Sequence, residues 1–229
     1  SSTSSLLLVT GPTGSGKTTT LYSFLSHLNH LSKNIVTMED PIEYELLGIN
    51  QSQVNEQAGF SFEVGLRSML RQDPDYLMIG EIRDKKTVTI AIEAALTGHL
   101  VLSTLHTTNA APVITRLIDM GVEPFLVSAA LGGILAQRLV RLLCQACCKK
   151  QPLLPEQKIF FERFFQEQLV LKKELSFPQE LSVPVGCQSC SGRGYKDRIA
   201  IFEWIACDQE IKALILQRAS SQEIALFAQ

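Results

Sequence analysis

A glycine-rich segment near the start of the chain carries the clearest chemical signal. Its sequence, GPTGSGKT at 11–18, follows an apolar run at 6–9 and precedes an amphipathic helical pattern. Glycines let the backbone curve around a polyphosphate, so that its N–H groups and the helix N-terminus face the anion. Lys17 is the cation expected to reach the β- and γ-phosphates of ATP, and the Thr18 hydroxyl is the expected Mg²⁺ ligand. The residues predicted to bind the nucleotide are Gly11, Pro12, Thr13, Gly14, Ser15, Gly16, Lys17, Thr18 and Thr19.

Hydrolysis of a bound triphosphate also needs carboxylates that bind Mg²⁺ and orient the attacking water. Glu81 follows an apolar run at 76–79, with Gly80 where an Asp commonly ends such a strand. Glu39, Asp40 and Glu43 follow another apolar run at 35–38. Each carboxylate has a structural alternative, as a helix cap or as a partner of Arg83. The candidate catalytic carboxylates are Glu81, Glu39 and Glu43, with Asp40 as a further candidate.

Two histidines flank a third apolar run, at 100–105. His106 follows this run and His99 precedes it. A histidine at a strand end is often structural, but it can also contact or sense the γ-phosphate. His106 is therefore the fourth candidate catalytic residue, ahead of His99.

Four of the six cysteines form two C-x-x-C pairs, Cys144/Cys147 and Cys187/Cys190. Four thiolates in two knuckles suit tetrahedral Zn²⁺, and metal binding is the better interpretation in a compartment where disulfides are rare. The alternative is unpaired buried thiols. Cys148 is an alternative to Cys147 in register, and Cys207, flanked by apolar residues, is expected in the core.

Apolar runs that alternate with helical patterns predict an α/β fold with a mainly parallel sheet flanked by helices. Strands are expected at 6–10, 35–38, 76–79 and 100–105, and helices after the glycine-rich loop, at 61–70 and from the N-cap Asp84 to Gly98. Ligands of such sheets lie beyond the carboxyl ends of the strands. The glycine-rich loop, the acidic cluster, Glu81 and His106 all follow strands, so they are expected to meet at one site.

Beyond this region the pattern becomes helical. Asn109 is expected to cap a helix that ends at 120–121, and a longer helix is expected over 124–143. The predicted organisation is an ATPase core at 1–143, a tetracysteine zinc-binding element at 144–190 and a C-terminal helical segment at 191–229 that opens with a Ser220/Glu223 capping box. Within the tetracysteine element, an inserted helix carries an apolar face of Phe160, Phe161, Phe164, Phe165 and Leu169.

Composition excludes several classes of protein. The 229 residues are 45% hydrophobic and 19% charged, an ordinary globular balance. A net charge of −2 and the lack of a basic, aromatic groove pattern disfavour nucleic acid as a partner. The apolar stretch at 125–135 is too short to span a bilayer, and the serine-rich N-terminus lacks the basic region of a secretory signal. A cytoplasmic location is expected.

Taken together, these motifs resemble the secretion ATPases of type II secretion and type IV pilus assembly. GPTGSGKTTT at 11–20 is similar to the family's phosphate loop, TMEDPIEY at 37–44 to its Asp box, LRQDPDYLMIGEIRD at 70–84 to its atypical Walker B segment and TGHLVLSTLHT at 97–107 to its His box. The two C-x-x-C pairs resemble the zinc-binding element of the assembly ATPases. The resemblance covers nearly all of 5–205, in the family's order.

The resemblance implies a RecA-like, P-loop ATPase core and a hexameric motor at the cytoplasmic face of the inner membrane. Glu81 matches the family's catalytic glutamate, and the Asp and His boxes line the nucleotide site. Such motors work with cytoplasmic and inner-membrane components of the secretion or pilus machine. Family members carry a further domain before the phosphate loop and a longer C-terminal tail, and glycine where Asp197 stands here. The chain is expected to be a fragment of a longer protein or a reduced paralogue.

The function expected is therefore an ATP-hydrolysing, Mg²⁺-dependent motor that powers pseudopilus assembly in type II protein secretion. One alternative is a type IV pilus assembly ATPase, and another is a nucleotide-binding assembly subunit with little turnover. A nucleic-acid motor is a further rival, because RecA-like folds also serve helicases. The arginines that are candidates to reach a neighbouring subunit's nucleotide are Arg67, Arg71, Arg83, Arg116, Arg138 and Arg141.

Overall fold

The chain forms two compact units in the computed structural model, which describes residues 4–169 and 178–228. The first unit comprises Ser1–Arg138 with Ile201–Ala228, and the second comprises Leu139–Ala200. The division falls inside two long strands, β6 (Leu131–Leu143) and β9 (Tyr195–Ala206), which contribute to both units. The boundaries expected after 143 and 190 stay a prediction.

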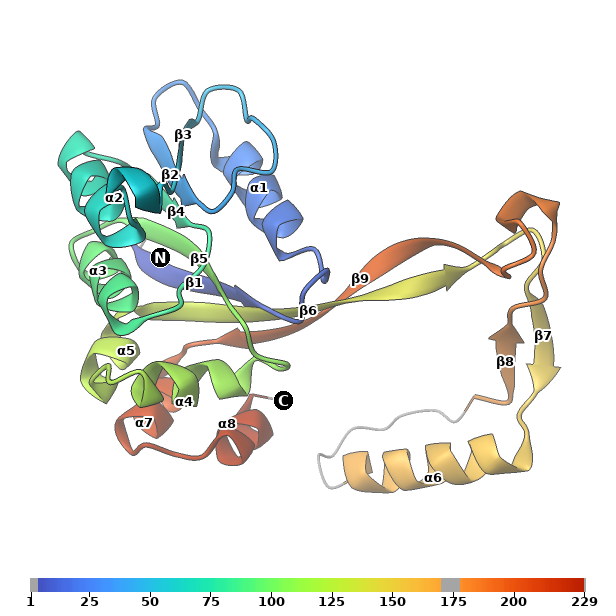
Figure 1. Ribbon diagram of the computed structural model, residues 1–229. Coiled ribbons are helices and arrows are strands. Elements are labelled where there is room, and N and C mark those ends of the chain that lie inside the picture. The colour runs from blue at the N-terminus through green and yellow to red at the C-terminus, as the bar shows by residue number, and fades with distance from the viewer. Residues whose placement is uncertain (1–3, 170–177, 229) are drawn as a thin grey trace. The chain divides into compact units, whose positions relative to one another are not determined.

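A seven-stranded sheet forms the centre of the first unit, in the order β3-β2-β4-β5-β1-β6-β9 (Figure 1). Its first five strands along the chain are β1 (Ser5–Thr10), β2 (Ile35–Glu39), β3 (Asn50–Gln53), β4 (Tyr76–Ile79) and β5 (Leu100–Leu105). Neighbouring strands from β3 to β6 pair in parallel. The predicted α/β fold with a mainly parallel sheet is confirmed.

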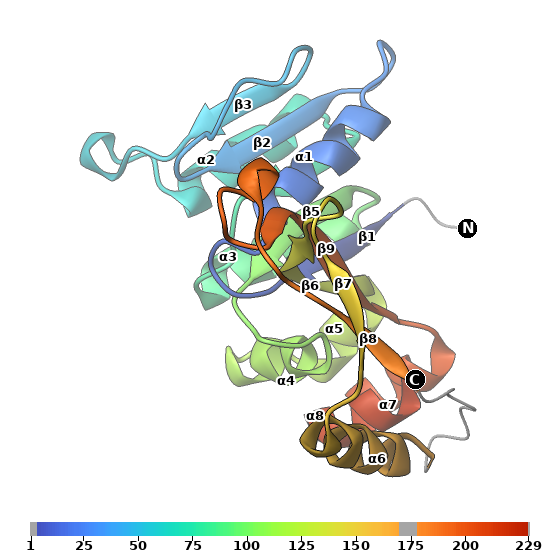
Figure 2. The same cartoon turned by 90° about the vertical axis from the view of Figure 1, so that its right-hand side faces the viewer.

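Helices cover both faces of this sheet (Figure 2). One apolar cluster joins the sheet to Leu21, Tyr22 and Leu25 of the helix α1, and a larger cluster joins it to the other helices. The helices of this unit are α1 (Lys17–Leu28), α2 (Phe62–Met69), α3 (Lys85–Leu96), α4 (Ala111–Asp119), α5 (Pro124–Ala130), α7 (Gln209–Leu216) and α8 (Ser221–Phe227), with 3₁₀ turns at Glu56–Ala58 and Leu70–Gln72.

Local capping rules explain where several helices begin. The Asp84 carboxylate accepts a hydrogen bond from Thr87 N–H at 2.9 Å, as an N-cap does. Ser220 and Glu223 form the reciprocal bonds of a capping box at the start of α8. Both predicted caps are confirmed. Asn109, in contrast, is not the cap of α4, whose N-cap is Ala110, and its side-chain oxygen accepts instead from Arg138 at 3.3 Å.

The long helix expected over 124–143 is wrong. Helix α5 ends at Ala130, and 131–143 form β6, which pairs in parallel with β1. Gly132 and Gly133 disfavour a continuing helix. A side chain at Gly133 would also collide with Trp204, since a Cβ there would lie 2.2 Å from the indole ring. The run 131–137 is largely buried, as expected for an inner strand of a parallel sheet.

The C-terminal segment is not helical throughout either. Residues 195–206 form β9, which runs back along β6: Cys144 N–H donates to the Gly194 carbonyl at one end and Cys207 N–H to the Gly132 carbonyl at the other. Cys207 is buried, as expected of a core residue.

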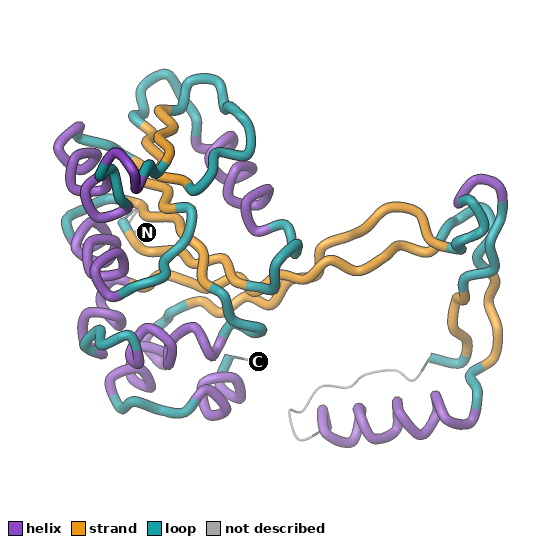
Figure 3. Tube along the Cα trace, viewed as in Figure 1, coloured by secondary structure: helices purple, strands orange, loops and turns teal. Residues whose placement is uncertain are grey.

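The second unit is small and mixed in structure (Figure 3). Strands β7 (Lys149–Pro152) and β8 (Glu180–Val183) pair antiparallel, a 3₁₀ turn spans Gln188–Cys190, and helix α6 covers Pro155–Leu169. Phe160 on α6 is 64% exposed and stacks on Phe164, with ring centroids 6.4 Å apart. The side chains of Phe165 and Leu169 lie outside the described residues. None of the helices described is both long enough and apolar enough to cross a membrane.

Candidate functional site

The glycine-rich loop joins β1 to α1 as the sequence predicts. Gly16 is the N-cap of α1 and has φ +86°, a conformation that favours glycine. The Lys17 ammonium donates to the carbonyl oxygens of Gly11 at 2.9 Å and Pro12 at 3.1 Å. Burial lowers the pKa of Lys17, and the negative charge of Glu81 acts in the opposite direction. The loop thus holds a cation and a helix N-terminus together, ready to bind an anion.

The loop opens onto a cleft of about 580 Å³. Four separate segments meet around it: the loop and the start of α1, the acidic segment after β2, the Gly80/Glu81 segment after β4, and the end of β5 with His106. The lining residues include Thr13, Lys17, Thr18, Glu39, Asp40, Glu43, Glu81 and His106. The carboxyl ends of the strands therefore bring together the candidate residues that the sequence analysis selected.

Glu81 lies between the side chains of Arg83 and His106. Its side chain is 16% exposed; one carboxylate oxygen forms an ion pair with Arg83, and the other lies 3.2 Å from His106 Nε2. Arg83 also lies 3.5 Å from the Asp40 carboxylate. The structure thus joins the Asp box, the Walker B segment and the His box through Glu81 and Arg83.

Glu39 is more buried than Glu81 and is bound differently. It is 2% exposed and accepts hydrogen bonds from the Tyr22 hydroxyl, from Thr37 Oγ1 at 2.6 Å and from Gln51 Nε2 at 3.0 Å. Burial and the bond to Glu39 raise the pKa of Tyr22. Both Glu39 oxygens already have protein donors, so this side chain anchors the end of β2 to α1 and β3 from the wall of the cleft.

Two other candidates differ in their surroundings. Glu43 is exposed at the cleft, and its N–H donates to the Tyr22 hydroxyl at 3.3 Å. The Nδ1 atom of His99 lies 2.9 Å from the Ala94 carbonyl oxygen and 3.2 Å from Thr97 Oγ1. His99 therefore caps the end of α3 and does not line the cleft.

Sequence reasoning missed Thr10, which joins the phosphate loop to the His box. This fully buried hydroxyl lies 2.9 Å from the Leu105 carbonyl oxygen and accepts from Thr107 N–H at 2.8 Å. The hydroxyl and the Thr107 hydroxyl are 2.8 Å apart. The sequence did offer one signal of this role, because Thr10 is a polar residue at the end of an otherwise apolar run.

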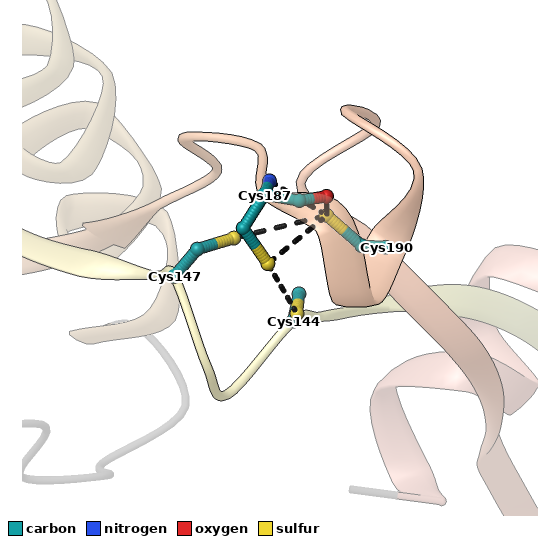
Figure 4. Close-up of side chains that lie close together, drawn as sticks. All are labelled: Cys144, Cys147, Cys187 and Cys190. Carbon is teal, nitrogen blue, oxygen red and sulfur yellow. Dashed lines mark hydrogen bonds between the residues drawn. The ribbon is translucent and has the colours of Figure 1, made fainter.

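The second unit holds a separate cluster of four cysteines, drawn in Figure 4. The sulfur atoms of Cys144, Cys147, Cys187 and Cys190 all lie within 4.8 Å of one another. Three of the sulfur pairs are 3.8–3.9 Å apart. A disulfide would need about 2.05 Å, whereas tetrahedral zinc with Zn–S bonds of about 2.3 Å places its sulfurs about 3.8 Å apart. The donor set and its spacing fit a tetrahedral zinc ion.

Backbone N–H groups support these sulfurs. Cys190 Sγ accepts from the N–H groups of Cys187 and Gly194, each at 3.2 Å, and Cys147 Sγ accepts from Gly186 N–H at 3.4 Å. The Cys187 N–H bond, with that of Gly194, lowers the pKa of Cys190 to about 6, whereas burial raises the pKa of Cys147 to about 11. Donors of this kind orient thiolate ligands around a metal. The Cys148 thiol lies 4.0 Å from the Gln145 carbonyl oxygen and is not one of the four clustered sulfurs, so among the described residues the register that includes Cys147 is the one that forms the cluster.

The family of the chain follows from comparison with known proteins. The model of the family described as "Type II/IV secretion system protein" matches residues 1–229. The chain belongs to this family. It is 51% identical over 223 residues to the type II secretion system protein E of Pseudomonas aeruginosa, covering 97% of this chain and 42% of that protein. It is 50% identical over 219 residues to the type IV pilus assembly ATPase PilB of Myxococcus xanthus, covering 96% of this chain and 38% of that protein.

Two solved ATPase structures have a similar fold. The pilus retraction motor PilT with bound ADP superposes with a TM-score of 0.67 at 31% identity, covering 98% of this chain and 53% of that one. The Legionella pneumophila ATPase DotB superposes with a TM-score of 0.63 at 25% identity, covering 100% and 52%. The chain spans less than half the length of these curated relatives and about half of these solved chains.

Proposed function

We propose that this chain is the nucleotide-binding segment of an ATPase motor that powers pseudopilus assembly in type II protein secretion. The observation that carries the proposal is the convergence of the phosphate loop, Glu81, His106 and the carboxylates after β2 on one cleft. The similarity to type II secretion system protein E, and the ADP bound to the PilT motor, support it.

The proposed chemistry assigns a different role to each part of the cleft. The loop N–H groups and Lys17 bind the phosphates, for which Lys17 must exchange its present contacts with the Gly11 and Pro12 carbonyls. Glu81 orients the attacking water, and His106, beside Glu81, contacts the γ-phosphate side of the cleft. Thr18 and the neighbouring carboxylates offer oxygen ligands to Mg²⁺, which neutralises phosphate charge when bound.

A type IV pilus assembly ATPase is the second candidate, because the identity to PilB of Myxococcus xanthus, 50%, is nearly as high. The genes beside this one separate the two functions. A secretin and pseudopilins would support type II secretion, whereas pilins and a retraction ATPase would support pilus assembly.

We also propose that the motor is a homo-oligomer, a hexamer, that works with components of the secretion machine at the cytoplasmic face of the inner membrane. A shared site follows from the chemistry, because a cation from a neighbouring subunit would stabilise charge that develops on the transferred phosphoryl group. Among the candidate arginines, Arg83 already pairs with Glu81 and Asp40 of its own chain. Arg138 donates to the Thr108 carbonyl of its own chain.

Turnover of the chain should depend on its concentration if sites are shared between subunits. The 229-residue chain is expected to bind ATP and Mg²⁺ but to hydrolyse slowly. When this chain is fused to the part of the Pseudomonas aeruginosa relative that lies outside the matched segment, the hydrolysis rate per chain should rise steeply as the protein concentration increases. Phosphate release at increasing protein concentration measures this directly. A fast rate per chain that is independent of concentration would contradict the shared site.

The tetracysteine cluster is expected to bind one Zn²⁺ per chain. Metal analysis of freshly reduced protein should give a zinc-to-protein ratio of about one, and Cys187→Ser should lower the zinc content sharply because one of four ligands is lost. Zinc ligation also offsets the entropy of closing the 39-residue segment between Cys147 and Cys187.

The matched control for this prediction is Cys148→Ser, which removes a neighbouring thiol that is outside the cluster. It should keep the full zinc content. Equal zinc loss in the Cys148 and Cys187 variants, or no zinc in the wild-type chain, would rule out the proposed ligand set.

A further inference from the structure

Gln137 on β6 lies against the phosphate loop and the first turn of α1, yet it is not among the residues that line the cleft. The residue is 3% exposed. Its Nε2 donates to the Ser15 carbonyl at 2.7 Å, and its Oε1 accepts from Thr20 Oγ1 at 2.7 Å. Its own carbonyl oxygen would lie 2.3 Å from a Cβ at position 11, so only glycine fits at the start of the loop. One residue of β6 thus lies close to Gly11, bonds to Ser15 in the middle of the loop and bonds to Thr20 in the first turn of α1.

The bond to Ser15 fixes more than one carbonyl group. The Ser15 carbonyl and the Gly16 N–H belong to the same peptide unit, which is planar and trans, so the two groups point in opposite directions. With the carbonyl held toward Gln137, the Gly16 N–H points away from β6. Gly16 lines the cleft. Within 4–169 and 178–228, no backbone acceptor is found for the Gly16 N–H.

An amide is well suited to this position. It supplies a donor for the Ser15 carbonyl and an acceptor for Thr20 from one uncharged group. Because the site is buried, water does not replace either bond at low cost if the amide is removed. Methionine has a similar size without these groups, and glutamate keeps the acceptor but loses the donor.

We propose that Gln137 is a positioning residue that turns the Gly16 N–H toward the phosphates of the bound nucleotide. This inference rests on the proposed function of the cleft. Gln137 acts through the main chain of the loop and touches no substrate, so its removal should weaken phosphate binding and leave the chemical step unchanged.

The test compares Gln137→Met and Gln137→Glu with wild type in nucleotide binding and steady-state hydrolysis. Gln137→Met is expected to raise the Kd of a non-hydrolysable ATP analogue with Mg²⁺, and the KM for ATP, about tenfold, with kcat within twofold of wild type. Gln137→Glu should raise the Kd further, since an ionised carboxylate would lie against the Ser15 carbonyl oxygen and repel it. Thr20→Val, which leaves the bond to Ser15 in place, should change Kd less than threefold.

Two further variants make the outcome decisive. Ile134→Val removes one methyl group from the same strand and should lower the melting temperature without changing Kd, so a loss of stability alone is recognised.

Lys17→Ala reports on the cleft itself. If Lys17→Ala binds the analogue as well as wild type does, the proposed function fails. If Lys17→Ala loses binding while both folded Gln137 variants keep wild-type Kd and KM, the role of Gln137 is wrong. Should Gln137→Met fail to fold, the Kd of Gln137→Glu is compared with that of Thr20→Val. A larger Kd for Gln137→Glu supports the role of Gln137, and an equal or smaller one contradicts it.

Discussion

Replacing Glu81 with glutamine is expected to leave ATP binding within about threefold of wild type and to lower the hydrolysis rate by about 100-fold or more. Glutamine keeps the shape of the side chain but loses the negative charge that orients water and attracts Mg²⁺. It also loses the ion pair with Arg83, whose side chain is 62% exposed. Single-turnover hydrolysis with the chain in excess over labelled ATP measures the rate, and equilibrium titration measures the affinity.

The matched control is Glu45→Gln, the same chemical change at an exposed glutamate that does not line the cleft. It should leave both quantities unchanged. Glu39→Gln tests the anchoring role of Glu39: it should loosen the contacts with Tyr22 and Gln51 and affect affinity as well as rate. A Glu81 variant that loses affinity and rate in equal measure would show that Glu81 holds the nucleotide and does not act in the chemical step.

Replacing Lys17 with alanine is expected to weaken triphosphate binding by at least about 100-fold. Bonds between an ammonium and phosphate oxygens are charge-assisted, and each contributes about 1.5–3 kcal/mol. The Gly11 and Pro12 carbonyls would also lose their present donor, so the loop itself loses support. Titration with a fluorescent ATP analogue gives the affinity.

Lys33→Ala is the matched control, because it removes an exposed lysine that pairs with Asp75. Its nucleotide affinity should equal that of wild type. Similar losses for the Lys17 and Lys33 variants would indicate nonspecific attraction of the nucleotide to positive charge, and the phosphate loop would not be the binding site.

Much of the site was predictable because it depends on local rules. The loop at 11–18 has a fixed spacing, and the Asp84 and Ser220 caps depend on side chains within three residues of the helix start. The convergence of Glu81, His106 and the acidic segment follows from one property of parallel sheets, that the carboxyl ends of the strands share an edge.

The elements that were missed depend on contacts distant in sequence. The run at 131–143 has apolar residues that suit a buried strand or a buried helix, and pairing with β1 decides between them. Strand β3 has the polar sequence Asn50–Gln53 and forms through backbone bonds to β2 at the edge of the sheet. Gln137 gave no signal, because its partners are the carbonyl of Ser15 and the hydroxyl of Thr20, more than 100 residues away.

The central claim, that the cleft binds a nucleotide by its phosphates, is tested most directly by calorimetric titration of the chain with a non-hydrolysable ATP analogue and, in parallel, with AMP. We expect about one analogue bound per chain in the presence of Mg²⁺ and at least about 100-fold weaker binding of AMP, because AMP lacks the β- and γ-phosphates that the loop N–H groups and Lys17 are proposed to bind. Equal affinity for the two ligands, or no binding of the analogue, would contradict it.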